Sequence, residues 1–118
     1  MLELQTDTEK RMVLVTAVGA IRPADFQAIM PKLGESVSGW DSFRVLFDWE
    51  TLEGWDPAAE SDAFYARLQF RSKVERVAVI AGPKWSGEIS RLSEIFDCEV
   101  RWFALSERDE ARAWIGAN

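Results

Sequence analysis

The chain has 118 residues, of which 47% are hydrophobic and 29% are charged, and 20 acidic residues against 14 basic ones give a formal net charge of -6. This length and composition predict one globular domain over residues 1–118, and the acidic balance without a basic run argues against nucleic acid as a partner. A single cysteine excludes an internal disulfide and fits the cytoplasm, where we expect the protein. No apolar stretch approaches the ~18 residues of a membrane span.

The first part of the chain predicts a hairpin and a helix. Leu2 and Leu4 alternate with polar residues, and a β-branched run follows over residues 12–18, so two strands form an antiparallel hairpin. Pro23 suits the first turn of a helix. Pro31 lies inside that helix, where proline removes a hydrogen bond, and we expect a kink there. The kink is either a tolerated surface bend or a hinge that opens a cleft.

Residues 43–48 form the strand around which the rest of the chain is organised. The run is apolar without alternation, which is typical of a strand covered on both faces in a mostly parallel sheet. An acidic loop that bears Trp49 and Trp55 follows it. Asp56-Pro57 then predicts the cap and first turn of a second helix, whose apolar residues are Ala59, Ala63, Phe64, Leu68 and Phe70. Ligands tend to bind at the carboxyl ends of strands in open α/β sheets, so this loop is the first candidate site.

The second part of the chain continues the alternation of strands and helices. Residues 77–81 predict another buried strand, and a third helix carries Trp85, Ile89, Leu92 and Phe96. A last strand with Val100, Trp102 and Phe103 precedes a short helix, which we expect to begin at a capping box from Ser106 to Asp109. Its inner side is Ala111, Trp114 and Ile115. The order β-β-α-β-α-β-α-β-α predicts an α/β fold with a mostly parallel sheet of four or five strands, an antiparallel N-terminal hairpin and helices on its faces.

The residue types present exclude several kinds of chemistry. The chain has no histidine, which removes the usual general base, the Ser-His and Cys-His nucleophile pairs and the commonest zinc ligand. Cys98 sits between two acidic residues that disfavour its thiolate, and we interpret it as structural or incidental. Residues 82–87 follow a strand and open a helix, but they lack the spacing of a Walker A phosphate loop. We expect no cofactor and no catalytic residues.

Four carboxylates near the central strand are a weaker candidate for a metal site. Asp48, Glu50, Glu53 and Asp56 could hold a divalent cation through oxygen ligands, but a solvated loop with a capping aspartate is the preferred interpretation. A receiver-type phosphoacceptor at Asp48 is rejected, because residues 19–22 lack the acidic pair that binds magnesium in receivers. We therefore expect no metal.

Six tryptophans in a chain of this length are unusual. Trp85 and Trp114 fall on helical stripes and are expected in the core, and Trp102 in the last strand is ambiguous. Trp49 and Trp55 lie in or beside the acidic loop, where a tryptophan either covers the edge of the core or lines an apolar pocket. Packing at the core edge is favoured, but the number of tryptophans keeps a site for a hydrophobic ligand open.

The chain resembles the SpoIIAA-like proteins, a small bacterial family with a STAS-type fold that is sometimes described as related to the lipid-carrying SEC14 (CRAL-TRIO) fold. The resemblance covers essentially the whole chain and rests on Val45-Leu46-Phe47-Asp48, Glu53-Gly54-Trp55-Asp56, Glu75-Arg76-Val77-Ala78-Val79-Ile80, Lys84-Trp85, Phe103 and Ala111-Arg112-Ala113-Trp114-Ile115. It implies a four- or five-stranded sheet with helices on its faces, and either protein interaction, as in anti-anti-sigma factors, or binding of a hydrophobic ligand with transient membrane association.

One expected feature of anti-anti-sigma factors is missing. The resemblance implies a phosphorylatable serine at the start of the helix after the central strand, but this place reads Gly54-Trp55-Asp56-Pro57, and Ser61 is about a turn further on. A regulated partner switch therefore loses its main support. An interaction module or homodimer that lacks the phosphoacceptor stays as the alternative function, and an enzyme that uses Asp48 and Lys84 is the third.

The first hypothesis is a non-enzymatic domain that binds a small apolar or amphipathic ligand near the carboxyl end of the central strand. Trp55, Phe64 and Trp85 would form apolar walls, Lys84 would meet an anionic head group, and the helix around Pro31 would move. Asp48 and Gly54 complete the candidate site. Any membrane contact would be peripheral and would rest on apolar side chains, because the net charge opposes binding to anionic lipid.

Overall fold

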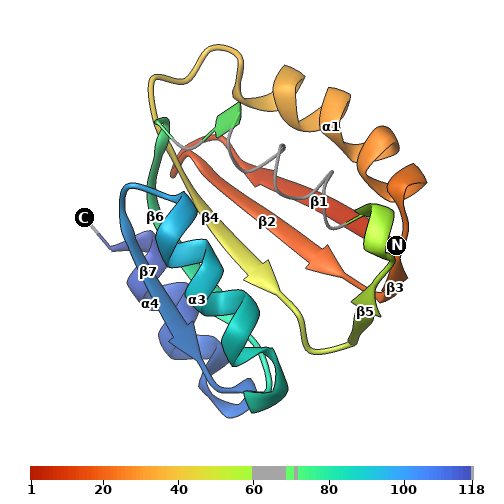
Figure 1. Ribbon diagram of the computed structural model, residues 1–118. Coiled ribbons are helices and arrows are strands. Elements are labelled where there is room, and N and C mark those ends of the chain that lie inside the picture. The colour runs from red at the N-terminus through yellow and green to blue at the C-terminus, as the bar shows by residue number, and fades with distance from the viewer. Residues whose placement is uncertain (60–68, 71, 118) are drawn as a thin grey trace.

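The main sheet has five strands and the predicted directions. A computed structural model describes residues 1–59, 69–70 and 72–117. The sheet order is β1-β2-β4-β6-β7, and the strands are β1 (Leu2–Asp7), β2 (Met12–Ala17), β4 (Phe43–Asp48), β6 (Val74–Ile80) and β7 (Glu99–Phe103) (Figure 1). β1 and β2 pair antiparallel, and every other neighbouring pair is parallel. The predicted α/β fold with an antiparallel N-terminal hairpin is confirmed.

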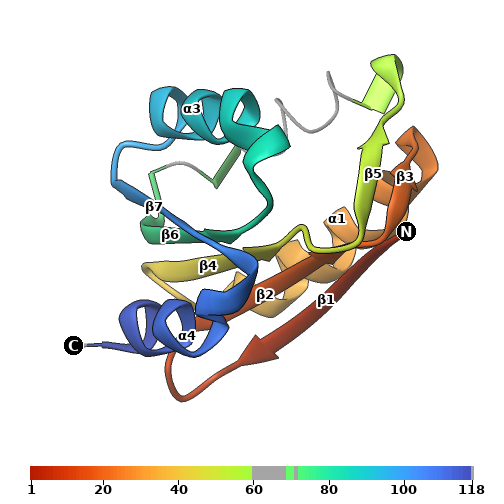
Figure 2. The ribbon, with the colours of Figure 1, turned by 90° about the horizontal axis from the view of Figure 1, so that it is seen from below.

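Helices lie on both faces of this sheet. They are α1 (Pro23–Val37), α3 (Ser86–Ile95), which follows the 3-10 turn η1 (Pro83–Trp85), and α4 (Arg108–Gly116), which follows η2 (Leu105–Glu107). α3 and α4 lie on opposite sides of the sheet (Figure 2). Of the predicted second helix, residues 57–59 and 69–70 are helical. Ala63, Phe64 and Leu68 lie outside the described residues.

A small second sheet was missed by the sequence prediction. β3 (Gly19–Ile21) pairs parallel with β5 (Leu52–Trp55). Gly19 has a φ of 70°, which lets the chain bend between β2 and β3 at little steric cost. The segment predicted as an irregular acidic loop thus contains a strand, and main-chain pairing with β3 fixes the backbone that carries Trp55.

The helix starts agree with the sequence in one case and differ in another. Asp56 caps residues 57–59, since its Oδ1 accepts a hydrogen bond from the Ala58 N–H at 2.9 Å. The predicted capping box from Ser106 to Asp109 is wrong, because the chain first forms the η2 turn. Instead, the Glu107 carboxylate accepts a hydrogen bond from the Ala104 N–H at 2.7 Å.

Alternation along the strands divides the core between the two faces. Val45 belongs to the larger apolar cluster, which α1 and α3 cover. The adjacent Leu46 belongs to a smaller cluster, which α4 covers with Ala111 and Ile115. None of the helices in the described ranges has the length and apolar character needed to cross a membrane.

Candidate ligand-binding site

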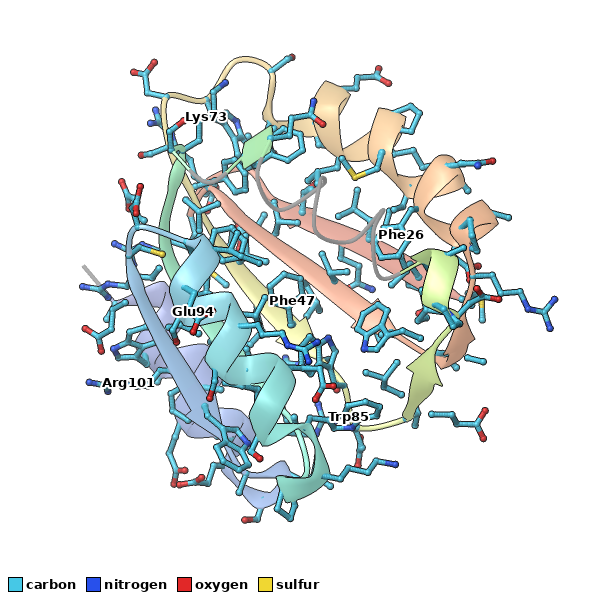
Figure 3. The ribbon with its side chains drawn as sticks, viewed as in Figure 1. Phe26, Phe47, Lys73, Trp85, Glu94 and Arg101 are labelled. Carbon is cyan, nitrogen blue, oxygen red and sulfur yellow. The ribbon has the colours of Figure 1, made fainter. Side chains whose placement is uncertain are left out.

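A cavity of about 80 Å³ lies between α1 and the main sheet. Its floor comes from β1, β2 and β4, and α1 supplies Phe26, Ile29, Met30 and Leu33. Phe26 extends from α1, and Phe47 rises from β4 on the same side of the sheet (Figure 3). Every described side chain that lines the cavity is aliphatic or aromatic, and the indole N–H groups of Trp49 and Trp55 are the only side-chain hydrogen-bond donors among them.

A row of aromatic rings closes the cavity at the carboxyl end of β4. Phe26 stacks on Trp55 with ring centroids 6.1 Å apart, and Trp55 meets the edge of Trp49 at 5.9 Å. Trp49 in turn contacts Trp85 at 6.3 Å and Phe47 at 5.9 Å. These separations and tilts are typical of favourable aromatic pairs. The row joins α1, β4, β5 and η1 in one apolar wall.

The predicted aromatic residues of the site therefore do lie near one another. Trp55 lines the cavity, and Trp85 is buried behind Trp49 rather than in the lining. Lys84 is exposed, with its Nζ 5.0 Å from the centre of the Trp85 ring, which is a cation–π contact at the outer side of the wall. Gly54 lies in β5 and adds no side chain. Phe64 lies outside the described residues.

Asp48 does not join this group, because it projects from the opposite face of β4. Arg108, the first residue of α4, donates to its two carboxylate oxygens at 2.7 and 3.1 Å. Burial acts to raise the pKa of Asp48, but hydrogen bonds from Arg108 and the Glu50 N–H, with the charges of Arg108 and Arg112, outweigh burial and hold that pKa below its ordinary value. This carboxylate is an ion-pair partner of α4.

The acidic loop does not form a metal centre in the described part of the chain. Asp48 and Glu50 both bind Arg108, and Asp56 caps a helix. Within the described ranges, no group of three or more acidic or cysteine side chains is placed to hold a metal ion.

Pro31 is exposed on α1, and the helix continues on both sides of it from Pro23 to Val37. Its ring has no N–H to complete the helical hydrogen bond at that position. The site is thus roofed by a helix with one interrupted turn. Movement at Pro31 stays a prediction.

Three other sequence expectations concern single residues. Trp102 is 43% exposed, but its indole N–H donates to the Ala81 carbonyl at 2.9 Å, so the ring is fixed at the edge of the sheet. Trp114 is half-buried against Phe103 at 6.0 Å. Burial, with the neighbouring Asp97, raises the pKa of the half-buried Cys98 thiol, which agrees with a structural cysteine.

Phe26 and Trp49 are site residues that the sequence reasoning did not select. Phe26 was not singled out within its predicted helix, and Trp49 was assigned to the edge of the core. A signal for Trp49 existed, because strand alternation places it on the face of Val45 and Phe47 and opposite Asp48. The signal for Phe26 is absent from the chain, since its contact with Trp55 depends on the unpredicted pairing of β3 with β5.

Comparison with known proteins assigns the chain to a family. Residues 12–116 match the SpoIIAA-like family, and the chain belongs to it. A similar solved structure is an uncharacterised protein from Shewanella loihica with a SpoIIAA-like fold, with a TM-score of 0.81, 19% identity and coverage of 98% of this chain and 92% of that one. Another is the anti-sigma factor antagonist SpoIIAA in its unphosphorylated form, with a TM-score of 0.61, 13% identity and coverage of 97% and 98%. No curated protein matched the chain.

Proposed function

We propose that this SpoIIAA-like domain is a non-enzymatic binding protein for a small apolar or amphipathic molecule, held between α1 and the main sheet. The observation that supports it is the cavity whose described lining is wholly apolar and whose wall is the aromatic row from Phe26 to Trp85. Ligand sites are commonly apolar hollows of this kind, with polar groups confined to the rim. Lys84 is the cation at the rim.

The volume of the cavity between α1 and the main sheet is too small for most ligands, so the proposal requires the cavity to widen. About 80 Å³ is the space of roughly two or three water molecules, whereas small-molecule sites measure about 300–1,000 Å³. The ligand must therefore displace α1 from the sheet. Pro31 is the position where α1 bends, because the helix already lacks a hydrogen bond there.

The geometry gives an enzyme little support. Asp48 and Lys84, the pair on which that hypothesis rested, have different partners: the carboxylate is bound by Arg108, and the ammonium lies over the Trp85 ring. A general base works best with a pKa near the operating pH, and the pKa of Asp48 moves in the other direction.

Two adjacent residues of β2 allow a matched test. Val15 lines the cavity, whereas Leu14 belongs to the opposite face. The probe is 1-N-phenylnaphthylamine, an uncharged fluorophore that brightens in apolar surroundings. We expect Val15→Phe to remove its binding by filling the cavity and Leu14→Phe to retain it. Equal binding by both variants, or no binding by the wild-type chain, would contradict the proposal.

A second experiment looks for a natural ligand that stays bound during purification of the protein. Organic extraction with mass spectrometry identifies any bound apolar molecule, and native mass spectrometry of the intact chain gives its stoichiometry. We expect one molecule per chain, and the signal should fall in Val15→Phe and Trp55→Ala. An equal signal from Val15→Phe would place the molecule elsewhere.

A protein-interaction module is the second candidate, and the fold shared with an anti-sigma factor antagonist favours it. The stretch from Gly54 to Pro57 offers no serine or threonine, so the interaction would not depend on phosphorylation there. A dimer or stable complex in native mass spectrometry, with no ligand in the extract, would move the assignment to this candidate.

Membrane contact, where it accompanies ligand transfer, is proposed to be peripheral. The net charge of -6 opposes anionic lipid, so binding would come from apolar side chains. Flotation with anionic vesicles should then be unchanged when salt is raised, because salt screens charge and not apolar contact. Loss of flotation in salt would contradict this.

A further inference from the structure

A groove of about 260 Å³ lies on the other face of the sheet, between α4 and the β1–β2 hairpin. α4 covers β4, β6 and β7 on this face but leaves part of β2 open, as the view in Figure 2 shows. The floor of the groove consists of Met12, Leu14 and Leu46. Leu46 is buried in the apolar cluster under α4, and Met12 and Leu14 are partly buried against that cluster. The space equals that of about nine water molecules and lies just below the range of about 300–1,000 Å³ that is common for small-molecule sites, so only a small or narrow ligand fits without movement of a helix.

Two cationic side chains, Lys10 and Arg112, line the groove beside α4. Lys10 reaches the last turn of α4, where its Nζ is 3.8 Å from the position that a Cβ on Gly116 would take. Arg112 lies four residues before Gly116 on the same helix, a rise of about 6 Å along the axis, and it lines the groove together with Lys10. Both side chains are exposed.

These two cations differ from the other arginines around α4. Arg44, Arg76 and Arg108 donate hydrogen bonds to α4 or to β4 carboxylates, and Arg101 lies over the Trp114 ring at 4.8 Å. Within the described part of the chain, neither Lys10 nor Arg112 has a carboxylate within 4.0 Å, although the charge of Arg112 acts on Asp48 at longer range. Asp7, the acidic residue of the lining, accepts a hydrogen bond from the Lys10 backbone N–H at 3.1 Å.

The outer wall of the groove restricts the kind of occupant. On this face, β1 presents Gln5 and Asp7, which line the groove with Thr6. A helix with a broad apolar side would bury these polar groups without partners, at a cost of roughly 1–3 kcal/mol each. A narrow molecule that covers the floor and leaves the polar wall hydrated avoids that cost.

We propose that this groove is a second ligand site, separate from the cavity under α1, which takes a small amphipathic monoanion such as a medium-chain carboxylate. Its apolar part lies on Met12, Leu14 and Leu46, and its anionic group lies between Lys10 and Arg112. The charged side chains that line the groove are Lys10, Arg112 and Asp7, which sum to +1 although the domain as a whole is acidic. The Asp48 carboxylate, outside the lining, also interacts with the charge of Arg112. The site thus combines local attraction for one negative charge with an apolar surface.

The test uses octanoate as the probe, with amide chemical-shift titration of the intact domain. We expect saturable shifts that centre on β2 and the last turns of α4. The double variant Lys10→Gln/Arg112→Gln should bind about three- to tenfold more weakly, because it removes two exposed charge contacts with the carboxylate. Lys32→Gln/Arg91→Gln removes two exposed cations from α1 and α3 and should bind within about twofold of the wild type.

Three results would overturn the proposal: absence of saturable octanoate shifts, equal affinity in both double variants, or equal affinity for uncharged octanol. Both double variants change exposed side chains, so folding does not confound the comparison. Failure here is distinct from failure of the cavity proposal. Val15→Phe should leave octanoate binding in the groove intact, and Leu14→Phe should impair it while phenylnaphthylamine still enters the cavity.

Discussion

The two faces of the main sheet are held by different kinds of contact. On the α1 side, Val13, Val45 and Trp49 belong to one large apolar cluster, and the described lining of its cavity is apolar throughout. On the α4 side, the cluster around Leu46 is smaller, and arginines bind both ends of the helix. The first face is joined by contacts without preferred direction, and the second by directed hydrogen bonds.

The arginines fix α4 at two points. Arg108 binds Asp48 at the start of the helix. Arg44 and Arg76, neighbours in register on β4 and β6, donate to carbonyl groups of residues 114, 115 and 117 at its end, where the helix dipole is negative. These bonds have defined lengths and angles, so a shift of α4 by a fraction of a turn would break several of them at once.

α1 has almost no such ties. In the part of the chain that the structure describes, its one polar link towards the sheet is the pair between the exposed Met1 ammonium and the half-buried Asp25 carboxylate, 3.6 Å apart. Apolar contacts tolerate sliding, because neighbouring side chains exchange one partner for another. The comparison therefore teaches that the face with the cavity is the one that can widen, while the face with the groove keeps its shape.

Loss of the central aromatic residue should have the largest effect. Trp49 is 1% exposed and contacts Phe47, Trp55 and Trp85, so Trp49→Ala should lower the free energy of unfolding by about 3–5 kcal/mol. Urea denaturation followed by circular dichroism measures this. Trp102→Ala, at the exposed tryptophan, should cost about 1 kcal/mol for its hydrogen bond. Equal losses would contradict the assignment of the aromatic row to the core.

Removal of the arginine at the start of α4 should come next. Arg108→Met removes both arginine hydrogen bonds from the half-buried Asp48 carboxylate and leaves it only the Glu50 N–H, so we expect a loss of about 2–3 kcal/mol at pH 7. Arg91→Met, at an exposed arginine on α3, is the control and should lie within about 0.5 kcal/mol of the wild type.

The same variant predicts a pH dependence. Because the pKa of Asp48 is lower in the folded chain than the ~3.9 of an unfolded aspartate, its contribution is complete above that pH and is lost as pH falls towards the folded value. The difference in unfolding free energy between wild type and Arg108→Met should therefore shrink below about pH 4. A difference that is constant from pH 7 to pH 3 would mean that the Asp48 charge does not carry the effect.

The sequence predicted most of the main sheet, because its strands are long enough to show a pattern. Residues 43–48 contain the apolar run Val45-Leu46-Phe47, and the observed β4 has the predicted bounds. The pair β3 and β5 escaped prediction for the opposite reason. Three or four residues such as Gly19–Ile21 show no periodicity, and their pairing joins segments far apart in the chain.

The candidate site was predictable in its aromatic part and not in its polar part. Trp55 and Trp85 follow neighbouring strands at one end of the sheet, and the parallel topology brings them near each other through Trp49. Asp48 was grouped with them because it ends the central strand, where the site was predicted. Its partner Arg108 is 60 residues away, and a single sequence contains no sign of that pairing.

A smaller effect of opposite sign is expected at Pro31. Pro31→Ala restores a helical hydrogen bond worth up to ~3 kcal/mol, offset by greater freedom of the unfolded chain, so stability should rise by about 1–2 kcal/mol. If ligand entry needs α1 to bend there, stopped-flow uptake of phenylnaphthylamine should also slow. Ala28→Gly, which loosens α1 one turn earlier, serves as the counterpart and should speed uptake. Unchanged rates in both variants would show that α1 moves as a unit or not at all.

The smallest effect on the free energy of unfolding is expected for the Arg101–Glu99 pair, which has the same charges as the Arg108–Asp48 pair of α4 but is more exposed. Arg101 and Glu99 lie 3.1 Å apart on β7, but both side chains are more than half exposed, so solvent screens the pair. Glu99→Gln should change the free energy of unfolding by less than about 0.5 kcal/mol, and added salt should abolish even that difference. A loss of unfolding free energy as large as that of Arg108→Met would mean that burial does not strengthen the arginine contacts of α4. The contrast between the two faces of the sheet would then depend on the number of charged contacts on each face and not on how far those contacts are buried.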